Sequence, residues 1–134
     1  MRKRLNRTPA ERRAAIEDLI DRDNARMRAD FLAQFAVLDG TQVLPHLMRP
    51  GLLALPGGNG PFYPAFQFNP QGQPWPLLAT VLAALPSHLS PWQRAYWLVA
   101  PDDRLGGETP IARIARSDPQ VVEAAHRAGE LPIG

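Results

Sequence analysis

The chain has 134 residues, which is enough for a single domain with a buried core. It contains no cysteine, and this excludes disulfides, thiolate catalysis and cysteine-ligated metals. No apolar run reaches the length of a membrane span, and we expect a cytoplasmic protein without a membrane segment.

The formal net charge is only +2, but it is unevenly distributed. Residues 1–50 hold ten basic and seven acidic residues, residues 51–93 hold none of either, and residues 94–134 hold five basic and six acidic. Residues 1–7 are predicted to be a flexible basic tail. Such a tail is either simply solvated or attracts nucleic acid weakly through its phosphates. Its cationic residues are Arg2, Lys3, Arg4 and Arg7.

Residues 8–50 are predicted to be an N-terminal helical region. Thr8, Pro9 and Glu11 form a capping box with proline at the first helical position. Apolar residues then recur at steps of three and four, which is typical of an amphipathic helix. They are Ile16, Leu19, Ile20, Met27, Phe31 and Phe35. Asp39-Gly40 either ends this helix or caps a second, short one that carries Val43 and Leu44.

A β-hairpin is predicted at the start of the second part of the chain, residues 51–134. The apolar runs 52–55 and 62–68 flank a Pro/Gly/Asn cluster at 56–61, and Pro64 is expected at a sheet edge. Proline then opens a series of short helices, at Pro76, Ser90-Pro91, Thr109-Pro110 and Asp118-Pro119. The predicted fold class is therefore mainly α, a small helical bundle with one short β-hairpin.

No catalytic constellation emerges from the residue pattern, and we expect neither an enzyme nor a bound cofactor or metal. His46, His88 and His126 have no ligand-type partner nearby in sequence. The few serines are typical of helix caps. Asp102-Asp103 is interpreted as a polar turn in which Asp103 binds loop amides. Most of the aromatic residues in the helical part of residues 51–134 are expected in the core, with one at an interface. They are Trp75, Trp92, Tyr96 and Trp97.

An ordered set of short motifs runs through the last third of the chain. The set comprises Trp97-Leu98, Pro101-Asp102-Asp103, Leu105-Gly106-Gly107, Thr109-Pro110-Ile111, and Asp118-Pro119 with Val121-Val122. It resembles the toxin-binding domain of the Xre/MbcA/ParS antitoxins. The preceding segments 52–56 and 63–68 look like the version of that family found beside RES-domain toxins.

The resemblance implies an antitoxin that binds and neutralises a cognate, NAD-consuming RES-domain toxin through residues 51–134. The expected partner-binding residues are Trp97, Leu105, Gly106, Gly107, Thr109, Pro110, Arg113, Arg116 and Arg127. For the two glycines, the simpler interpretation is that they only shape the corner between two helices, because glycine adopts backbone conformations closed to other residues.

The N-terminal half departs from the family, whose members carry a helix-turn-helix that binds DNA. Residues 38–44 match its first helix, but no recognition helix follows before Pro50, so the motif is shortened or degenerate. The alternatives are a DNA-binding regulator that uses the N-terminal helices and the hairpin as a wing, and a family member that binds no toxin. The apolar stripe of the first helix also suggests a homodimer.

Overall fold

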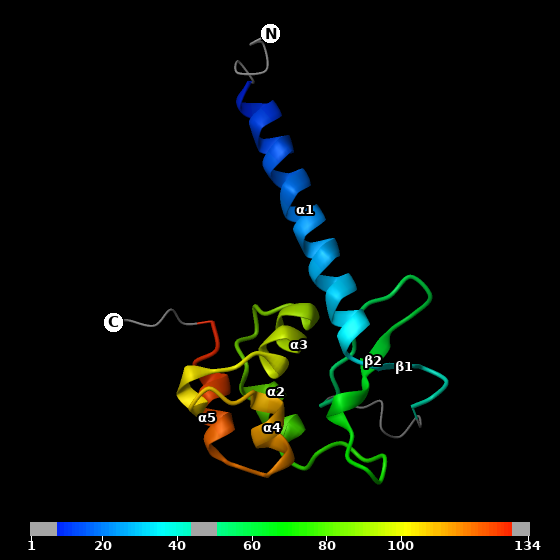
Figure 1. Cartoon of the computed structure of the whole chain (residues 1–134), viewed down its shortest axis with the longest axis vertical. Coiled ribbons are helices and arrows are strands. Elements are labelled where there is room, and N and C mark those ends of the chain that lie inside the picture. Colours follow the sequence, from blue (N-terminus) through cyan, green and yellow to red (C-terminus); the bar gives the residue numbers. More distant parts are fainter. Residues whose placement is uncertain (1–7, 44–50, 130–134) are drawn as a thin grey trace. The chain divides into compact units, whose positions relative to one another are not determined.

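The computed structural model describes residues 8–43 and 51–129. Within these residues the fold is mainly α, with five α-helices, two short 3-10 helices and one two-stranded antiparallel sheet. The predicted fold class is thereby confirmed. The chain divides into two units, the N-terminal helix α1 (Pro9–Gln34) and a second unit from Phe35 onward, which we call the C-terminal body (Figure 1). In the described ranges, no helix has both the length and the apolar character needed to cross a membrane.

Helix α1 begins where the sequence predicts. The Thr8 hydroxyl accepts a hydrogen bond from the Glu11 amide at 3.1 Å, and the Glu11 carboxylate accepts one from the Thr8 amide at 3.1 Å. This reciprocal capping box satisfies two amides that have no partner inside the helix. The helix ends at Gln34, so the helical region is shorter than the predicted range of 8–50.

The apolar side chains of α1 are largely in solvent. Ile16, Leu19 and Ile20 are 57%, 56% and 52% exposed, and Met27 is 48% exposed. Residues seven apart share one helix face. Asp23 therefore lies on the face of Ile16, so the apolar stripe is interrupted by charge.

The segment after α1 is extended, which corrects the predicted second helix. β1 (Val37–Asp39) is followed by a turn in which the Asp39 carboxylate accepts a hydrogen bond from the Thr41 amide at 2.8 Å. The Gln42 side chain in turn accepts one from the Asp39 amide at 2.9 Å. An Asp side chain that binds amides just ahead of it favours a turn over a helix. The first helix proposed for a helix-turn-helix at 38–44 is thus absent from residues 38–43, and Leu44 lies outside the described residues.

The sheet of the C-terminal body joins β1 to β2 (Phe62–Pro64), with Val37 opposite Pro64 and Asp39 opposite Phe62. The predicted strand partner of β2, residues 52–55, contributes only the single bridge between Leu55 and Phe62. Pro64 has no N–H to donate, and the pairing continues through the Ala65 amide, which donates to the Ala36 carbonyl at 2.9 Å.

Gln67 explains why the pairing of 52–55 stops at Leu55. Its fully buried side chain accepts from the Leu53 amide at 2.8 Å and donates to the Leu53 carbonyl at 2.9 Å. The same side chain also donates to the Pro64 carbonyl at 3.1 Å. The side-chain amide of Gln67 thus pairs with Leu53 as the backbone of a neighbouring strand would have done. It comes from a short 3-10 helix, Ala65–Gln67, directly after β2.

Four short helices make up the rest of the C-terminal body and lie close together (Figure 1). They are α2 (Leu78–Ala84), α3 (Pro91–Val99), α4 (Pro110–Ala115) and α5 (Gln120–His126). The predicted starts at Ser90 and Thr109 are confirmed, because each side chain accepts from the amide three residues ahead. α2 packs on α5, and α3 packs on α4. Their fully buried apolar side chains include Leu78, Val81, Leu98, Ile114 and Val121.

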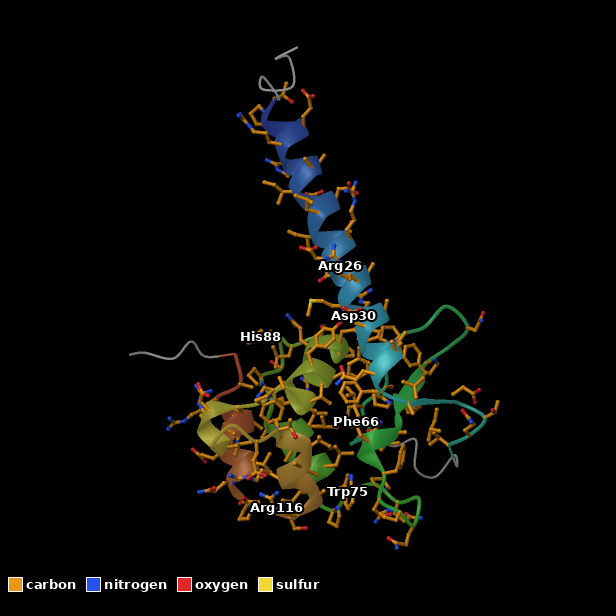
Figure 2. All side chains as sticks on the ribbon, in the orientation of Figure 1. Arg26, Asp30, Phe66, Trp75, His88 and Arg116 are labelled. Atoms are coloured by element: carbon orange, nitrogen blue, oxygen red, sulfur yellow. The ribbon has the colours of Figure 1, made fainter. Side chains whose placement is uncertain are left out.

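The aromatic residues divide between core and half-buried positions. Trp92 is buried, 7% exposed, and its ring meets those of Phe62 and Tyr96 at centroid distances of 6.0 and 5.9 Å. The half-buried Trp75 donates from its indole nitrogen to the Phe66 carbonyl at 2.8 Å, and Figure 2 labels both residues. The contact of Phe62 with Trp92 joins β2 to α3, and the Trp75 bond joins the segment after β2 to the residues that precede α2.

Candidate partner-binding surface

The motif Leu105-Gly106-Gly107 lies in a closed loop between α3 and α4. The Asp102 amide donates to the Glu108 carbonyl at 3.0 Å, and the Gly107 amide donates back to the Asp102 carbonyl at 3.0 Å. Gly106 and Gly107 both have positive φ, +66° and +86°, a region that L side chains rarely adopt. The two glycines therefore make the loop's shape possible, as the simpler interpretation of them predicts.

Asp102, and not Asp103, binds the loop amides. Its side chain accepts from the Arg104 amide at 2.8 Å and caps a 3-10 helix, Asp103–Leu105. The prediction for Asp103 is wrong, because Asp103 is itself the first residue of that helix and Asp102 occupies the capping position before it.

Three of the predicted residues are structural anchors in this loop. Leu105 is 1% exposed and Pro110 is fully buried, so both pack in the core of the C-terminal body. Thr109 caps α4 through its hydroxyl, which accepts from the Ala112 amide at 3.3 Å. These residues fix the direction in which α4 leaves the loop.

Arg113 ties the loop to both helices that follow it. Its Nε donates to Glu108 at 2.9 Å, its Nη1 to Asp118 at 2.6 Å and to Gln120 at 3.1 Å, and its Nη2 to the Leu105 carbonyl at 2.8 Å. The side chain is only 14% exposed. Its acceptors belong to the loop and to the start of α5, so Arg113 holds the loop against the corner between α4 and α5.

Arg116 completes this network from the solvent side. Both of its terminal nitrogens donate to Glu108, at 2.7 and 2.9 Å, and Figure 2 labels it beside the corner between α4 and α5. The hydrogen bonds from Arg116, and next those from Arg113, lower the pKa of the Glu108 carboxyl from 4.5 to about 2. The carboxylate is therefore ionised throughout the neutral range.

The turn between α4 and α5 is held by Asp118. Its carboxylate accepts from the Gln120 amide at 3.0 Å as well as from Arg113, and its pKa is lowered, first by the Gln120 amide. The preceding Ser117 has φ +55°, a left-handed conformation that normally favours glycine after a helix.

Trp97 lines a shallow hollow of about 460 Å³ with the loop and the end of α5. Its other walls are Pro101, Asp102, Asp103, Arg104, Ala128 and Gly129. Arg104 also borders a second hollow of about 300 Å³ that includes Gln120 and Arg127. Because the two hollows share Arg104, Trp97 and Arg127 lie on one continuous surface. We call this surface the α3–α5 face.

The structure thus brings most predicted site residues together, with unequal accessibility. Trp97 is half-buried, whereas Arg116 and Arg127 are exposed, and Leu105 and Pro110 are covered. Arg2, Lys3, Arg4 and Arg7 lie outside the described residues, as does His46. The pattern analysis missed Glu108 and Arg104. The bond between Glu108 and Arg113 spans a helix start at a spacing of five, which matches no regular helical pairing.

The described residues contain no group of three or more His, Cys, Asp or Glu side chains placed to hold a metal ion. Of the polar side chains that line the α3–α5 face, Asp102 accepts from the Arg104 amide and Gln120 accepts from Arg113. Comparison with protein-family models, with curated proteins and with solved structures gave no match.

Proposed function

We propose that this chain is an antitoxin-like protein that binds and neutralises a cognate, NAD-consuming RES-domain toxin through its α3–α5 face. The observation that carries the proposal is the closed loop at 102–108, which Arg113 fastens to the corner of α4 and α5. The loop is formed by the residues on which the resemblance to Xre/MbcA/ParS antitoxins rests.

The geometry of this face supports a docking role. A loop that is ordered before binding loses little conformational entropy when a partner arrives. Trp97 offers an aromatic surface at one side of this face, and Arg127 offers an exposed cation at the other. Tryptophan and arginine are the residue types most enriched among energetic hot spots of interfaces.

The test is a binding and activity assay with the RES-domain protein of the neighbouring gene. The full chain should form a stable complex on gel filtration and stop NAD loss by the toxin. Arg127→Glu should weaken the complex at least about tenfold, the effect of losing one good charge pair. Arg12→Glu, an exposed arginine on α1, is the matched control and should bind as the wild type does.

A chain that neither binds the RES-domain protein nor slows NAD loss would contradict the proposal. Equal losses from Arg127→Glu and Arg12→Glu would show that overall charge, and not the α3–α5 face, drives the association.

We also propose that α1 pairs with α1 of a second copy. Its large apolar side chains at 16, 19, 20 and 27 are each about half exposed, and pairing would bury them. Two chains related by a two-fold axis present the same stripe to each other, which is the usual geometry of a dimer.

A further inference from the structure

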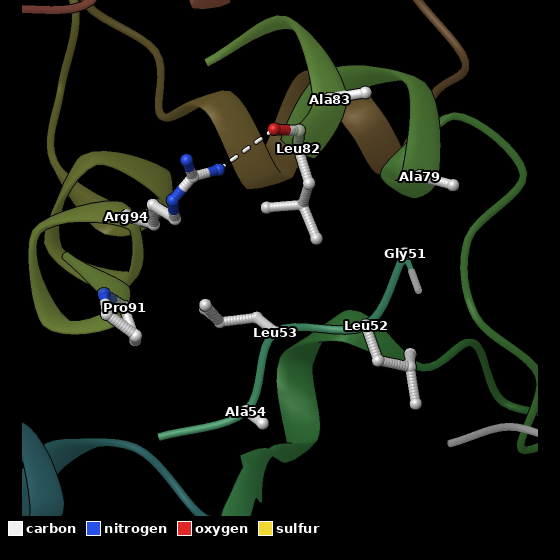
Figure 3. Close-up of a pocket in the computed structure, with 9 residues that line it drawn as sticks. All are labelled: Gly51, Leu52, Leu53, Ala54, Ala79, Leu82, Ala83, Pro91 and Arg94. Carbon is white, nitrogen blue, oxygen red and sulfur yellow. Dashed lines mark hydrogen bonds between the residues drawn. The ribbon is translucent and has the colours of Figure 1, made fainter. Parts of the chain in front are cut away.

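A third hollow in the C-terminal body, outside the α3–α5 face, lies between α2, the start of α3 and the segment 51–54 (Figure 3). Its volume is about 550 Å³. Leu53 and Leu82, 4% and 8% exposed, line it, and the exposed Ala79, Ala83 and Pro91 stand at its sides. It is therefore a shallow apolar groove.

The groove has a firm edge where the chain passes α2. Gly51 has φ +114°, and a Cβ at this position would lie 3.0 Å from the Ala79 Cβ. Two residues later, Leu53 is held by both polar groups of the Gln67 side chain. The backbone that lines the groove is thus close to α2 at Gly51 and is held by hydrogen bonds at Leu53.

Among the described residues, one charged group lines this apolar groove. Arg94 donates from Nε to the Leu89 carbonyl at 3.1 Å, from Nη1 to the Leu82 carbonyl at 2.9 Å, and from Nη2 to the Pro86 carbonyl at 3.1 Å. These carbonyls position the guanidinium but do not neutralise it. Each terminal nitrogen of an arginine carries a second N–H, which remains for another acceptor.

No carboxylate among the described residues forms an ion pair with Arg94. The sequence explains why, since residues 51–93 contain no acidic residue and supply nearly the whole lining of the groove. A half-buried cation beside apolar walls favours an anion more strongly than an exposed cation does, because the local dielectric is lower.

We propose that this groove is a docking site for a segment of a partner protein that presents aliphatic side chains next to a carboxylate. The aliphatic groups cover Leu53 and Leu82, and the carboxylate accepts from the guanidinium of Arg94. A peptide segment fits better than a small molecule, because exposed walls leave the groove too shallow to enclose one.

The experiment uses the full chain with labelled Leu and Ala methyl groups and labelled Arg side-chain nitrogens, observed by NMR. The probe is the acetylated and amidated tetrapeptide Ala-Leu-Leu-Glu, titrated beside otherwise identical peptides that end in Gln or Lys. We expect shifts at Ala79, Leu82 and the side-chain N–H of Arg94. Replacing Glu by Gln should weaken binding about tenfold, because the bond to the guanidinium loses its charge.

A blocking variant tests the location without touching the bonds of Arg94. Ala83→Phe should fill the groove and abolish the shifts, whereas Ala115→Phe, at an exposed alanine on α4, should bind as the wild type does. Absence of shifts with the Glu peptide, equal binding of the Glu and Gln peptides, or unchanged binding to Ala83→Phe would each overturn the proposal.

Discussion

Gln67 is the fully buried polar side chain of the C-terminal body, and every polar atom it carries has a partner. Burial of an amide in an apolar core is costly unless its hydrogen bonds are made. Here they are made to the backbone of Leu53, which would otherwise be left with an unpaired N–H and C=O. The residue therefore belongs to the fold and not to a binding site.

Gln67→Leu should lower the free energy of unfolding by about 2–4 kcal/mol, because it leaves the Leu53 amide and carbonyl and the Pro64 carbonyl without their partner. Urea denaturation followed by tryptophan fluorescence measures the change. Gln71→Leu, at an exposed position, is the control and should change little. Equal effects of the two substitutions would contradict the assigned role.

Glu108 makes the stability of the folded chain depend on pH. Its carboxyl has a pKa of about 2 in the folded chain, against 4.5 for the unfolded reference. Folding therefore favours the ionised carboxylate. Its contribution to the free energy of unfolding is complete above pH 4.5 and is lost as the pH falls toward 2. Thermal unfolding of the wild type should therefore move to lower temperature over this window.

The variant Glu108→Gln isolates this effect. It should unfold at a lower temperature than the wild type at pH 7, and the gap should narrow as the pH falls from 4.5 to 2. A gap that stays constant across that range would show that the carboxylate of Glu108 does not supply the stability.

At the scale of elements, the loop 102–108 and the helices α4 and α5 form one unit around Arg113. The guanidinium reaches the loop through Glu108 and Leu105 and reaches the start of α5 through Asp118 and Gln120. Lysine has a single ammonium group and cannot span these acceptors at once.

Arg113→Lys should therefore cost about 2 kcal/mol of unfolding free energy, the loss of hydrogen bonds to charged groups. Chemical denaturation measures it, with Arg22→Lys on α1 as a matched exposed control. Arg113→Lys should also weaken binding to the RES-domain protein, and only to the extent that the loop becomes disordered. Hydrogen exchange of the Gly106 and Gly107 amides measures that disorder. Full binding together with fast exchange would show that the loop's order is unimportant for recognition.

At the scale of the whole molecule, the two units have different sources of stability. The C-terminal body buries a set of aliphatic and aromatic side chains from both sheet and helices. Helix α1 exposes much of its apolar surface, and most of the stability of helices in proteins comes from packing of an amphipathic face. A second copy is the partner that we propose for it.

Light scattering of the full chain should accordingly give twice the mass of one chain. Ile20→Asp should shift the mass toward the monomer, because a charge would then replace an apolar contact of the dimer. Ala14→Asp lies on the opposite face of the helix by its spacing, introduces the same charge at a propensity cost no smaller than that of Ile20→Asp, and should leave the dimer intact. A monomeric wild type would rule out pairing through α1.

The features that the sequence predicted correctly are local ones. The caps at Thr8, Ser90 and Thr109 each join a side chain to an amide three residues ahead, so the pattern of residue types suffices to locate them. For the same reason the mainly α fold class was predictable. In the site, the sharp loop at Gly106-Gly107 followed from glycine alone.

Residue types and their spacing thus suffice to locate the starts of helices α1, α3 and α4 and the loop before α4. The pairing of β1 with β2, the place of Gln67 beside Leu53 and the position of Arg94 at an apolar groove follow from tertiary packing instead. Each of these features joins residues ten or more positions apart, where spacing carries no information. Their geometry depends on how the whole body packs, because a side chain's partners are selected by burial and not by its neighbours in the chain.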